Sequence, residues 1–268
     1  MRFSVSTWNI NSVRLRIALV ARYLDEQRPD VLCLQETKCP DAQFPLAEFA
    51  RLGYPHVAIN GQKGYHGVAI VSRHAFGRQS RRDFCAKGDS RHVAVTLAGK
   101  ADGLEIHNFY VPAGGDEPDP EINDKFAHKL AFVDEMAAWF GEEKKAAGRV
   151  VLVGDLNIAP LEHDVWSHKA LLDVVSHTPI EVEKLGRAQA AGPWIDALRK
   201  FAPDQQKLYT WWSYRARDWA KADKGRRLDH VWVSPALADA VKSMQVLREA
   251  RGWERPSDHA PVKVELTL

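Results

Sequence analysis

Short apolar segments with the dimensions of β-strands recur along the whole chain. They are Val31–Leu34, Gly67–Val71, Val93–Leu97, Leu104–Val111, Val150–Val153, Val231–Val233 and Val262–Leu266. Continuous apolar runs such as VLCL and VVLV are typical of strands covered on both faces, whereas the alternation in VKVEL predicts a strand with one face in water. We therefore expect a layered fold with several fully buried strands.

Two segments between these strands have helical periodicity. The apolar positions of the first are Val13, Ile17, Val20 and Leu24. Those of the second are Phe126, Leu130, Val133, Ala137 and Phe140. Ser12 is a candidate N-cap for the first helix, and Gly141 or Gly148 is a candidate end for the second. Strands and helices interleave at both ends of the chain, which predicts an α/β layered fold.

Composition and length indicate one soluble domain, residues 1–268. The chain has no repeat of fixed period, no low-complexity tract and no long Pro/Gly/Ser linker. Its three cysteines (Cys33, Cys39 and Cys85) form no C-x-x-C motif, which disfavours a disulfide scaffold or a cysteine zinc site. Because no segment is typical of a signal peptide or membrane span, we expect a cytoplasmic protein with no membrane partner. Nothing indicates a coiled coil, so we expect a monomer.

Polar side chains stand where six of the strand-like segments begin or end. They are Asn9, Asn11, Glu36, Tyr110, Asp155, Asn157, Asp229, Asp258 and His259. Strand ends in layered α/β folds meet at one rim, where ligand sites form. We therefore expect these side chains to lie close together.

Each of these residues also has an ordinary structural interpretation. Asp155 could form a turn, Glu36 could be a solvated acid beside Lys38, and His259 could be a structural histidine held by a neighbouring aspartate. Tyr110 could be a buried phenol with one hydrogen bond. The coincidence of polar groups at six strand ends favours a common site over six separate explanations.

The expected cluster has the chemistry of a phosphoesterase. Carboxylate and amide oxygens, without thiolates or paired histidines, favour Mg²⁺ or Mn²⁺ over zinc. A divalent ion among carboxylates, with a histidine and a tyrosine as donors, can promote attack of water on a phosphate ester. Sequence motifs of P-loop, dinucleotide-binding, zincin and α/β-hydrolase proteins are missing from the chain.

Eight segments together carry a family resemblance. In chain order they are WNINSVR, LQETK, GVAI, FYVPAGG, GDLNIAP, YTWWSYR, RLDHVWVS and SDHAPV. At these intervals they resemble the exonuclease III family of abasic-site DNA endonucleases, within the endonuclease/exonuclease/phosphatase superfamily. The similarity extends from residue 5 to 266. It implies a four-layer α/β sandwich, in which two packed mixed β-sheets are flanked by helices.

The resemblance also implies a role for each matched residue. The implied metal ligands are Asn9, Glu36, Asp155, Asn157, Asp258 and His259. The implied catalytic residues are Tyr110, Asp155, Asn157, Asp229 and His259. Asp155 would activate water or protonate the leaving group, Asn157 would orient the phosphate, and Asp229 would pair with His259. Tyr110 would face the scissile phosphate, and Lys38, which lies near Glu36, would contact the substrate.

Substrate-binding residues follow from the same comparison. Trp211 matches the aromatic wall of a pocket for an abasic sugar. Arg226 stands where some relatives place an apolar residue against that sugar, and we expect it to contact the substrate. Ala113 stands where the family often has Asn or Gln, and some relatives have an acid in place of Asn11.

Two basic segments would provide the DNA surface. Residues 73–91 and residues 214–227 each contain six Lys/Arg against two Asp, a local charge of +4 within a chain of net charge +2. A charge run is usually a solvated face, but the second segment adjoins Trp211 and Asp229. We expect both segments to contact the DNA backbone without reading its sequence.

The sequence therefore predicts a Mg²⁺- or Mn²⁺-dependent DNA repair nuclease. Its partner would be duplex DNA with abasic sites or recessed 3′ ends, incised 5′ to the abasic site or shortened by removal of 3′ nucleotides or blocking groups. One alternative is a metal-dependent phosphatase or phosphodiesterase of the same superfamily that acts on a non-DNA phosphate ester. A DNA-binding protein with a decayed site is the third hypothesis.

Overall fold

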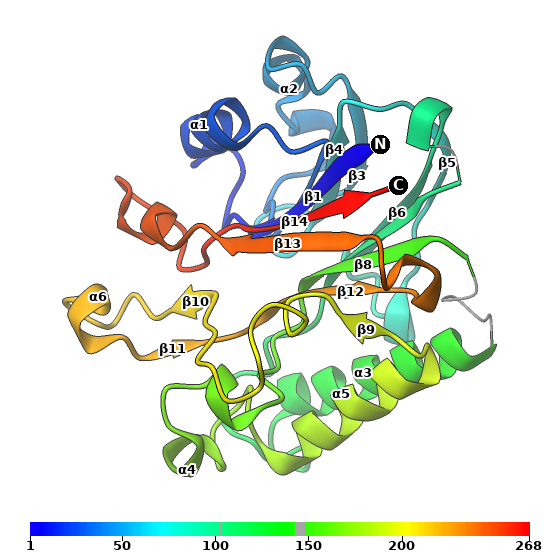
Figure 1. The fold of residues 1–268 in the computed structure, drawn as a ribbon. Coiled ribbons are helices and arrows are strands. Elements are labelled where there is room, and N and C mark those ends of the chain that lie inside the picture. The colour runs from blue at the N-terminus through cyan, green and yellow to red at the C-terminus, as the bar shows by residue number, and fades with distance from the viewer. Residues whose placement is uncertain (102, 143–147) are drawn as a thin grey trace.

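The computed structural model describes residues 1–101, 103–142 and 148–268. Across the first sheet the strands are β13 (Val241–Val246), β14 (Val262–Thr267), β1 (Arg2–Asn9), β2 (Val31–Gln35), β4 (Val68–Ser72) and β3 (His56–Asn60). Across the second they are β5 (Phe76–Ser80), β6 (His92–Leu97), β7 (Glu105–Tyr110), β8 (Val150–Asp155), β12 (Asp229–Val233) and β9 (Ile195–Asp196). The ribbon β10 (Trp211–Trp212) and β11 (Gly225–Arg226) stands apart from both sheets (Figure 1).

Helices cover the outer face of each sheet. They are α1 (Ile17–Gln27) and α2 (Leu46–Arg51) on one side, and α3 (Asp124–Glu142) and α5 (Pro179–Ala191) on the other. Two short helices, α4 (His168–Leu171) and α6 (Trp219–Ala222), belong to the loops and the ribbon away from the sheets. In Figure 1, α1 and α2 lie beside the first sheet, and α3 and α5 lie beneath the second. The two β-sheets between these helices make four layers, so the prediction of a four-layer α/β sandwich is confirmed.

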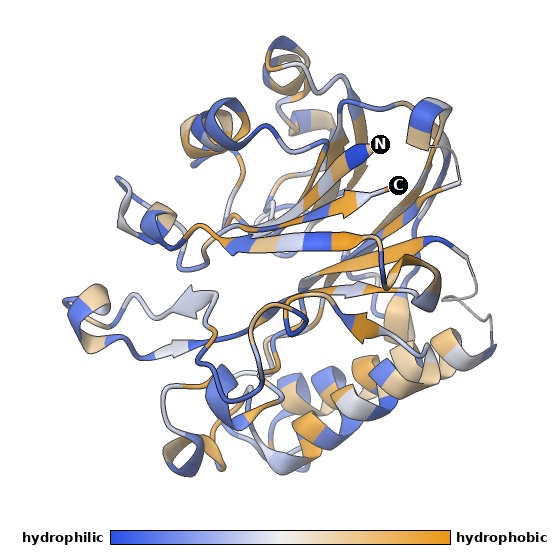
Figure 2. Ribbon diagram, viewed as in Figure 1, coloured by the Kyte–Doolittle hydropathy of each residue, from blue (hydrophilic) through white to orange (hydrophobic). Residues whose placement is uncertain are grey.

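The core follows the hydrophobic pattern of the strands. One large buried cluster joins the inner faces of the two sheets, for example Val5 and Val31 with Val151 and Val231. Two further clusters join the outer faces to α1 and α2 and to α3 and α5. β2 is buried at every position, whereas β14 alternates buried and partly exposed residues, both as the sequence predicts. Figure 2 shows β8 as largely apolar and α3 and α5 as mixed.

Strand direction brings the polar residues to one edge. β1 and β2 are parallel neighbours joined through α1, and β7 and β8 are parallel neighbours joined through α3. Their carboxyl ends therefore point the same way within each sheet. β12 and β14 run antiparallel to β8 and β1, so the residues at their amino ends reach the same edge.

The first helix begins later than the sequence predicts. Ser12 has φ of 87°, and its amide donates to the Glu36 carbonyl at 2.7 Å, while the Val13 amide donates to the Thr37 carbonyl at 3.1 Å. These bonds tie the segment to the turn after β2, so α1 starts at Ile17 and Ser12 does not cap it. The prediction of Ser12 as N-cap was wrong because a bond between distant segments replaced a local one.

The later helices also differ in detail. α3 passes through Gly141 and does not end there, and the chain between Glu142 and Gly148 lies outside the described residues. α5 was not predicted, although Thr178 and Glu181 form a capping box and Pro179 occupies the first turn. Within the described ranges, no helix combines the length and apolar character needed to cross a membrane.

Candidate active site

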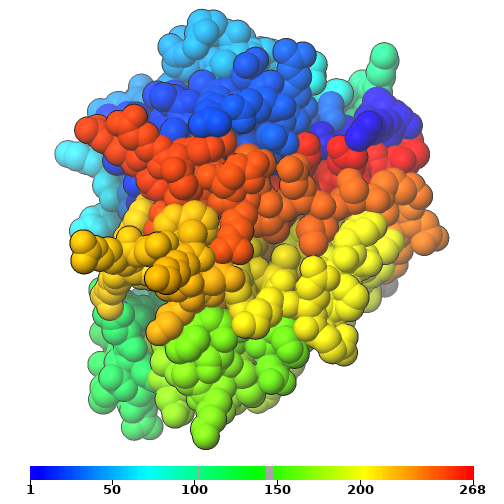
Figure 3. Space-filling model, turned by 60° about the vertical axis from the view of Figure 1, so that its left-hand side comes forward, coloured from blue at the N-terminus to red at the C-terminus, as the bar shows by residue number. Residues whose placement is uncertain are grey.

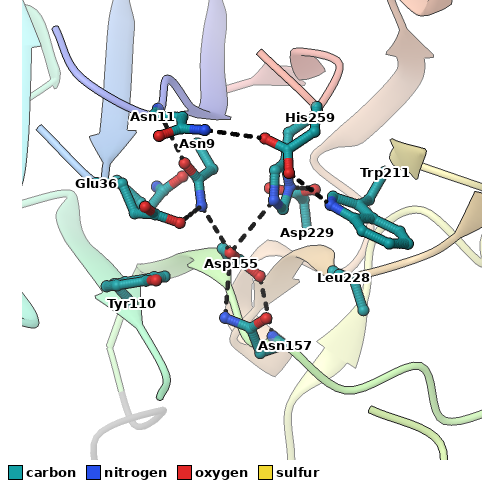
Figure 4. A network of polar contacts seen from close by, with 12 residues as sticks. Asn9, Asn11, Glu36, Tyr110, Asp155, Asn157, Trp211, Leu228, Asp229 and His259 are labelled. Atoms are coloured by element: carbon teal, nitrogen blue, oxygen red, sulfur yellow. Dashed lines mark hydrogen bonds and ion pairs between the residues drawn. The ribbon is translucent and has the colours of Figure 1, made fainter. Parts of the chain in front are cut away.

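A histidine held between two aspartates forms the centre of the site (Figure 4). The Nδ1 atom of His259 lies 2.8 Å from Oδ2 of Asp229, and its Nε2 atom lies 3.6 Å from Oδ2 of Asp155. All three residues are buried. The amide of Asp229 donates to the Thr210 hydroxyl at 3.1 Å, which fixes the start of β12. The imidazole is therefore held in one orientation, with one nitrogen directed at Asp155.

Two asparagine amides hold Asp155 from other directions. Asn9 Nδ2 donates to Asp155 Oδ2 at 2.8 Å and also to Glu36 Oε1 at 2.9 Å, so one amide joins carboxylates from the two sheets. Asn157 donates to Asp155 through its backbone amide at 3.0 Å and through Nδ2 at 3.2 Å. The φ of Asn157 is 54°, a left-handed conformation that asparagine tolerates better than most residues. The turn after β8 thereby folds back onto its own carboxylate.

Burial and neighbouring charges shift the pKa values of Asp155 and His259. Burial raises the pKa of Asp155 above its ordinary value, and the neighbouring His259 imidazole opposes that rise. For His259, burial lowers the pKa, but the carboxylates of Asp229 and Asp155 outweigh burial and raise it. A histidine between two carboxylates is therefore held in its protonated form, which favours the ionised form of Asp155.

Glu36, Lys38 and Tyr110 occupy the other side of the cluster. Lys38 Nζ lies 2.9 Å from Glu36 Oε2 and donates to Asn11 Oδ1 at 2.7 Å. Burial raises the pKa of Glu36, but Lys38 and the Asn9 amide outweigh burial and bring it below the ordinary value. Burial, Glu36 and Asp155 all raise the pKa of Tyr110 well above its usual value, so its phenol stays neutral and can donate a proton.

The donor set can accommodate a divalent cation. Asp155, Asp229 and His259 each present a ligand atom, and these atoms lie within 4.8 Å of one another. The Oδ1 atom of Asp229 is buried and has no hydrogen-bond partner among the described residues. Hard oxygen donors with an unused buried lone pair suit Mg²⁺ or Mn²⁺. Asp229, which the sequence assigned only to His259, is thus part of the closest group of candidate ligands.

Asp258 lies at the boundary between this cluster and a neighbouring cavity. It accepts hydrogen bonds from Trp211 Nε1 at 2.9 Å and from Asn11 Nδ2 at 3.4 Å. The cavity has a volume of about 750 Å³. Asn157, Asp258, Leu228, Trp211 and Arg226 contribute to its lining. In Figure 3 the gold segment that contains β10, β11 and α6 overhangs a hollow bordered by green segments.

The structure places the predicted substrate-binding residues in different surroundings. Trp211 and Arg226 face the cavity as cross-strand partners of the β10–β11 ribbon. Trp212 also contributes to the lining of the cavity, although it is only 2% exposed. Lys38 lies across the cluster beside Glu36.

Two residues of the basic segments are buried inside the protein. Arg227 is 1% exposed and bonds to the carboxylates of Asp164 and Asp196, and Arg91 is 5% exposed and pairs with Asp89. Their charges are therefore neutralised by protein groups, and neither segment presents its whole charge to solvent.

Sequence reasoning missed a buried ion pair behind the site. Lys129 and Glu181 are fully buried and contact each other. Lys129 Nζ also donates to the carbonyls of Asn157 at 2.7 Å and Ala113 at 3.3 Å, and Glu181 accepts from the Ser176 amide at 2.9 Å. This pair therefore ties three loops around the cavity to α3 and α5. The capping box of Glu181 was the one local signal for it.

Comparison with known proteins gives the class of protein that has this fold and site. The chain belongs to the Endonuclease/Exonuclease/phosphatase family, whose model matches residues 6–259. This confirms the superfamily predicted from the sequence motifs.

Several relatives match nearly the full length of the chain. The chain is 30% identical to exodeoxyribonuclease III of Haemophilus influenzae, over 97% of this chain and 98% of that one. It is similar in structure to an AP endonuclease from Archaeoglobus fulgidus, with a TM-score of 0.90, 29% identity and coverage of 99% and 100% of the two chains. It is similar too to the 3′ phosphatase NExo from Neisseria bound to a product DNA hairpin, with a TM-score of 0.89, 32% identity and the same coverage.

Proposed function

We propose that this protein is a DNA repair nuclease that hydrolyses phosphodiester bonds of duplex DNA. It incises the strand 5′ to abasic sites and removes 3′ nucleotides or 3′ blocking groups. The observation that carries this proposal is the buried Asp155, held by two asparagine amides and His259, directly beside a cavity lined by Trp211. Relatives named as an exodeoxyribonuclease III, an AP endonuclease and a 3′ phosphatase support it.

The proposed mechanism assigns the proton transfer to Asp155. Its ionised carboxylate, fixed by Asn9 and Asn157, orients and deprotonates the attacking water. Protonated His259, held by Asp229, stabilises negative charge on the phosphoryl oxygens, and neutral Tyr110 donates to the same oxygens. Because a protonated imidazole has no free lone pair, we assign His259 to charge stabilisation instead of metal binding.

Mg²⁺ or Mn²⁺ is the proposed cofactor, and it would act as a Lewis acid on the phosphoryl group. Glu36, Asp155, Asp229 and Asp258 would supply carboxylate oxygens, and Asn9 and Asn157 would supply amide oxygens. We propose a monomeric, single-domain enzyme of the cytoplasm. The three unpaired cysteines support a reducing setting.

A labelled duplex with one central abasic analogue tests this function. The purified protein is incubated with it in Mg²⁺ and, separately, in EDTA. We expect one incision product that requires the metal, and a ladder that shortens from the 3′ end if the exonuclease is also active. An intact duplex in both reactions and with Mn²⁺ would contradict the proposal. Hydrolysis of a small phosphate monoester without DNA cleavage would favour the alternative phosphatase.

A further inference from the structure

Two adjacent arginines on the β11–β12 segment have opposite environments. Arg227 bonds to Asp164 and Asp196 inside the protein. Arg226 faces the cavity, and among the described residues no carboxylate oxygen lies within ion-pair distance, 4.0 Å, of its guanidinium. Alternation along an extended chain sends neighbouring side chains to opposite faces, which explains why one charge is neutralised and the other is not.

The Arg226 guanidinium is held firmly in spite of having no anionic partner. Its Nη1 donates to the Val175 carbonyl at 2.9 Å and to the Ser176 hydroxyl at 2.7 Å. The guanidinium lies 5.3 Å from the ring centroid of Trp211, its cross-strand partner. Nε is buried and makes no hydrogen bond within the described part of the chain. The protein therefore fixes the position of this cation and leaves its charge uncompensated.

An uncompensated cation in this position is costly without a ligand. Burial lowers the pKa of Arg226 below its ordinary value, since removal from water disfavours the charged form. The carboxylate of Glu181 opposes this effect but is already paired with Lys129. A bound anion would form charge-assisted hydrogen bonds with the guanidinium and offset the loss of hydration.

The cavity connects this cation to the reacting phosphate. Asn157, which bonds to Asp155, and Arg226 line the same cavity, so a group attached to the scissile phosphate and lying in the cavity would approach the guanidinium. We propose that Arg226 is a specificity-determining residue that binds a carboxylate or phosphate carried by a short group at the 3′ end of DNA. This inference rests on the proposed nuclease function and adds a preference for anionic 3′-terminal groups.

Hydrolysis of such a 3′ end needs no reactant other than water. For a 3′-phosphoglycolate, water attacks phosphorus and the bond between phosphorus and O3′ breaks. The water oxygen stays on phosphorus, and a proton passes to O3′. The products are a DNA 3′-hydroxyl and free phosphoglycolate, whose carboxylate would lie against Arg226 in the cavity.

Two DNA ends that differ in one group test the proposal. One carries 3′-phosphoglycolate and the other the neutral 3′-(2-hydroxyethyl) phosphate, and kcat/KM is measured for each. We expect the unsubstituted protein to prefer the glycolate and Arg226→Leu to reduce that preference about tenfold or more, because a charge-assisted hydrogen bond is lost. Arg226→Lys should retain part of the preference, and Ser176→Ala should reduce it less than Arg226→Leu.

Arg215→Leu is the matched control, because Arg215 is an exposed cation that lines the same cavity. It should weaken binding of both ends alike and leave their ratio unchanged. An equal ratio in Arg226→Leu and the unsubstituted protein, or an equal loss of preference in Arg215→Leu, would overturn the inference while the nuclease function stands. Failure of the unsubstituted protein to cleave either end or the abasic duplex would instead contradict the proposed function.

Discussion

The catalytic cluster and the cavity beside it are built on opposite principles. In the cluster, Asp155 and His259 are buried and held by several hydrogen bonds from different strands. In the cavity, cations stack on tryptophans, with Lys224 Nζ 4.5 Å from the ring centroid of Trp166, and Arg226 has no carboxylate partner within the described residues. Groups whose charges are already balanced by neighbours suit a chemical step, whereas a fixed cation without an anionic partner suits selection of a ligand.

The two regions also differ in what supports them. The residues of the cluster lie at the ends of central strands, and the apolar side chains of these strands are buried between the sheets. The cavity is formed by loops and by the short β10–β11 ribbon, which lies outside both sheets (Figure 1). Rigid strands fix a reaction geometry, and loops allow a substrate pocket to differ between proteins of one fold.

Asp155→Asn should give the largest effect of the single changes. The variant keeps the shape of the side chain but cannot take a proton from water, so kcat should fall by about 10³-fold or more. DNA affinity should change only a few-fold. Steady-state kinetics and a binding titration check this, with Asp204→Asn as a control that removes an exposed carboxylate. Near-normal kcat in Asp155→Asn would refute the role of this residue.

Lys129→Met should destabilise the protein by about 3–5 kcal/mol, because it leaves Glu181 buried without its cation. The double variant Lys129→Met/Glu181→Gln removes that buried charge and should regain most of the stability in denaturant unfolding.

The kcat of the double variant should nevertheless stay about tenfold or more below normal. The Asn157 carbonyl has lost its hydrogen-bond donor in this variant, so the turn after β8 is no longer held in place. Recovery of both stability and kcat in the double variant would show that the ion pair only stabilises the fold.

Low pH should lower the free energy of unfolding through His230, the neighbour of Asp229 in β12. Burial lowers the pKa of this histidine to about 4, and its Nε2 donates to the Ile158 carbonyl at 2.8 Å. Because the folded-state pKa lies below the unfolded value of 6.5, its contribution is present above pH 6.5 and is lost as pH falls toward 4. We expect a loss of roughly 3 kcal/mol over this range.

His230→Gln, which can still donate to Ile158, should make the free energy of unfolding depend less on pH by about that amount. Chemical unfolding at several pH values measures the difference, and an identical pH dependence in the two proteins would argue against the role of His230.

Trp211→Ala should have the smallest effect of these changes. It removes a cavity wall and the hydrogen bond to Asp258, and kcat/KM for an abasic duplex should fall about tenfold, or 1–2 kcal/mol. Trp211→Phe keeps an aromatic face and should lose less. An unchanged kcat/KM in Trp211→Ala would exclude contact between this wall and the substrate.

The sequence predicted what depends on local pattern. Buried strands and the polar residues at their ends are encoded within a few positions, so the meeting of Glu36, Asp155, Asp229 and His259 at one edge follows from strand direction. The pair Lys129–Glu181 joins two helices, and no local pattern records that contact. Likewise, among the described residues Arg227 forms ion pairs and Arg226 does not, and this difference depends on which carboxylates the fold brings near each arginine.

One set of kinetic measurements tests most directly whether Asp155 serves the chemical step and Arg226 serves substrate selection. Single-turnover rates and kcat/KM are determined for the unsubstituted protein, Asp155→Asn and Arg226→Leu on the abasic duplex, the 3′-phosphoglycolate end and the neutral 3′ end. We predict that Asp155→Asn slows all three by a similar factor and that Arg226→Leu changes their ranking while most of the chemical rate is kept. A changed ranking in Asp155→Asn, or a uniform loss in Arg226→Leu, would contradict the account.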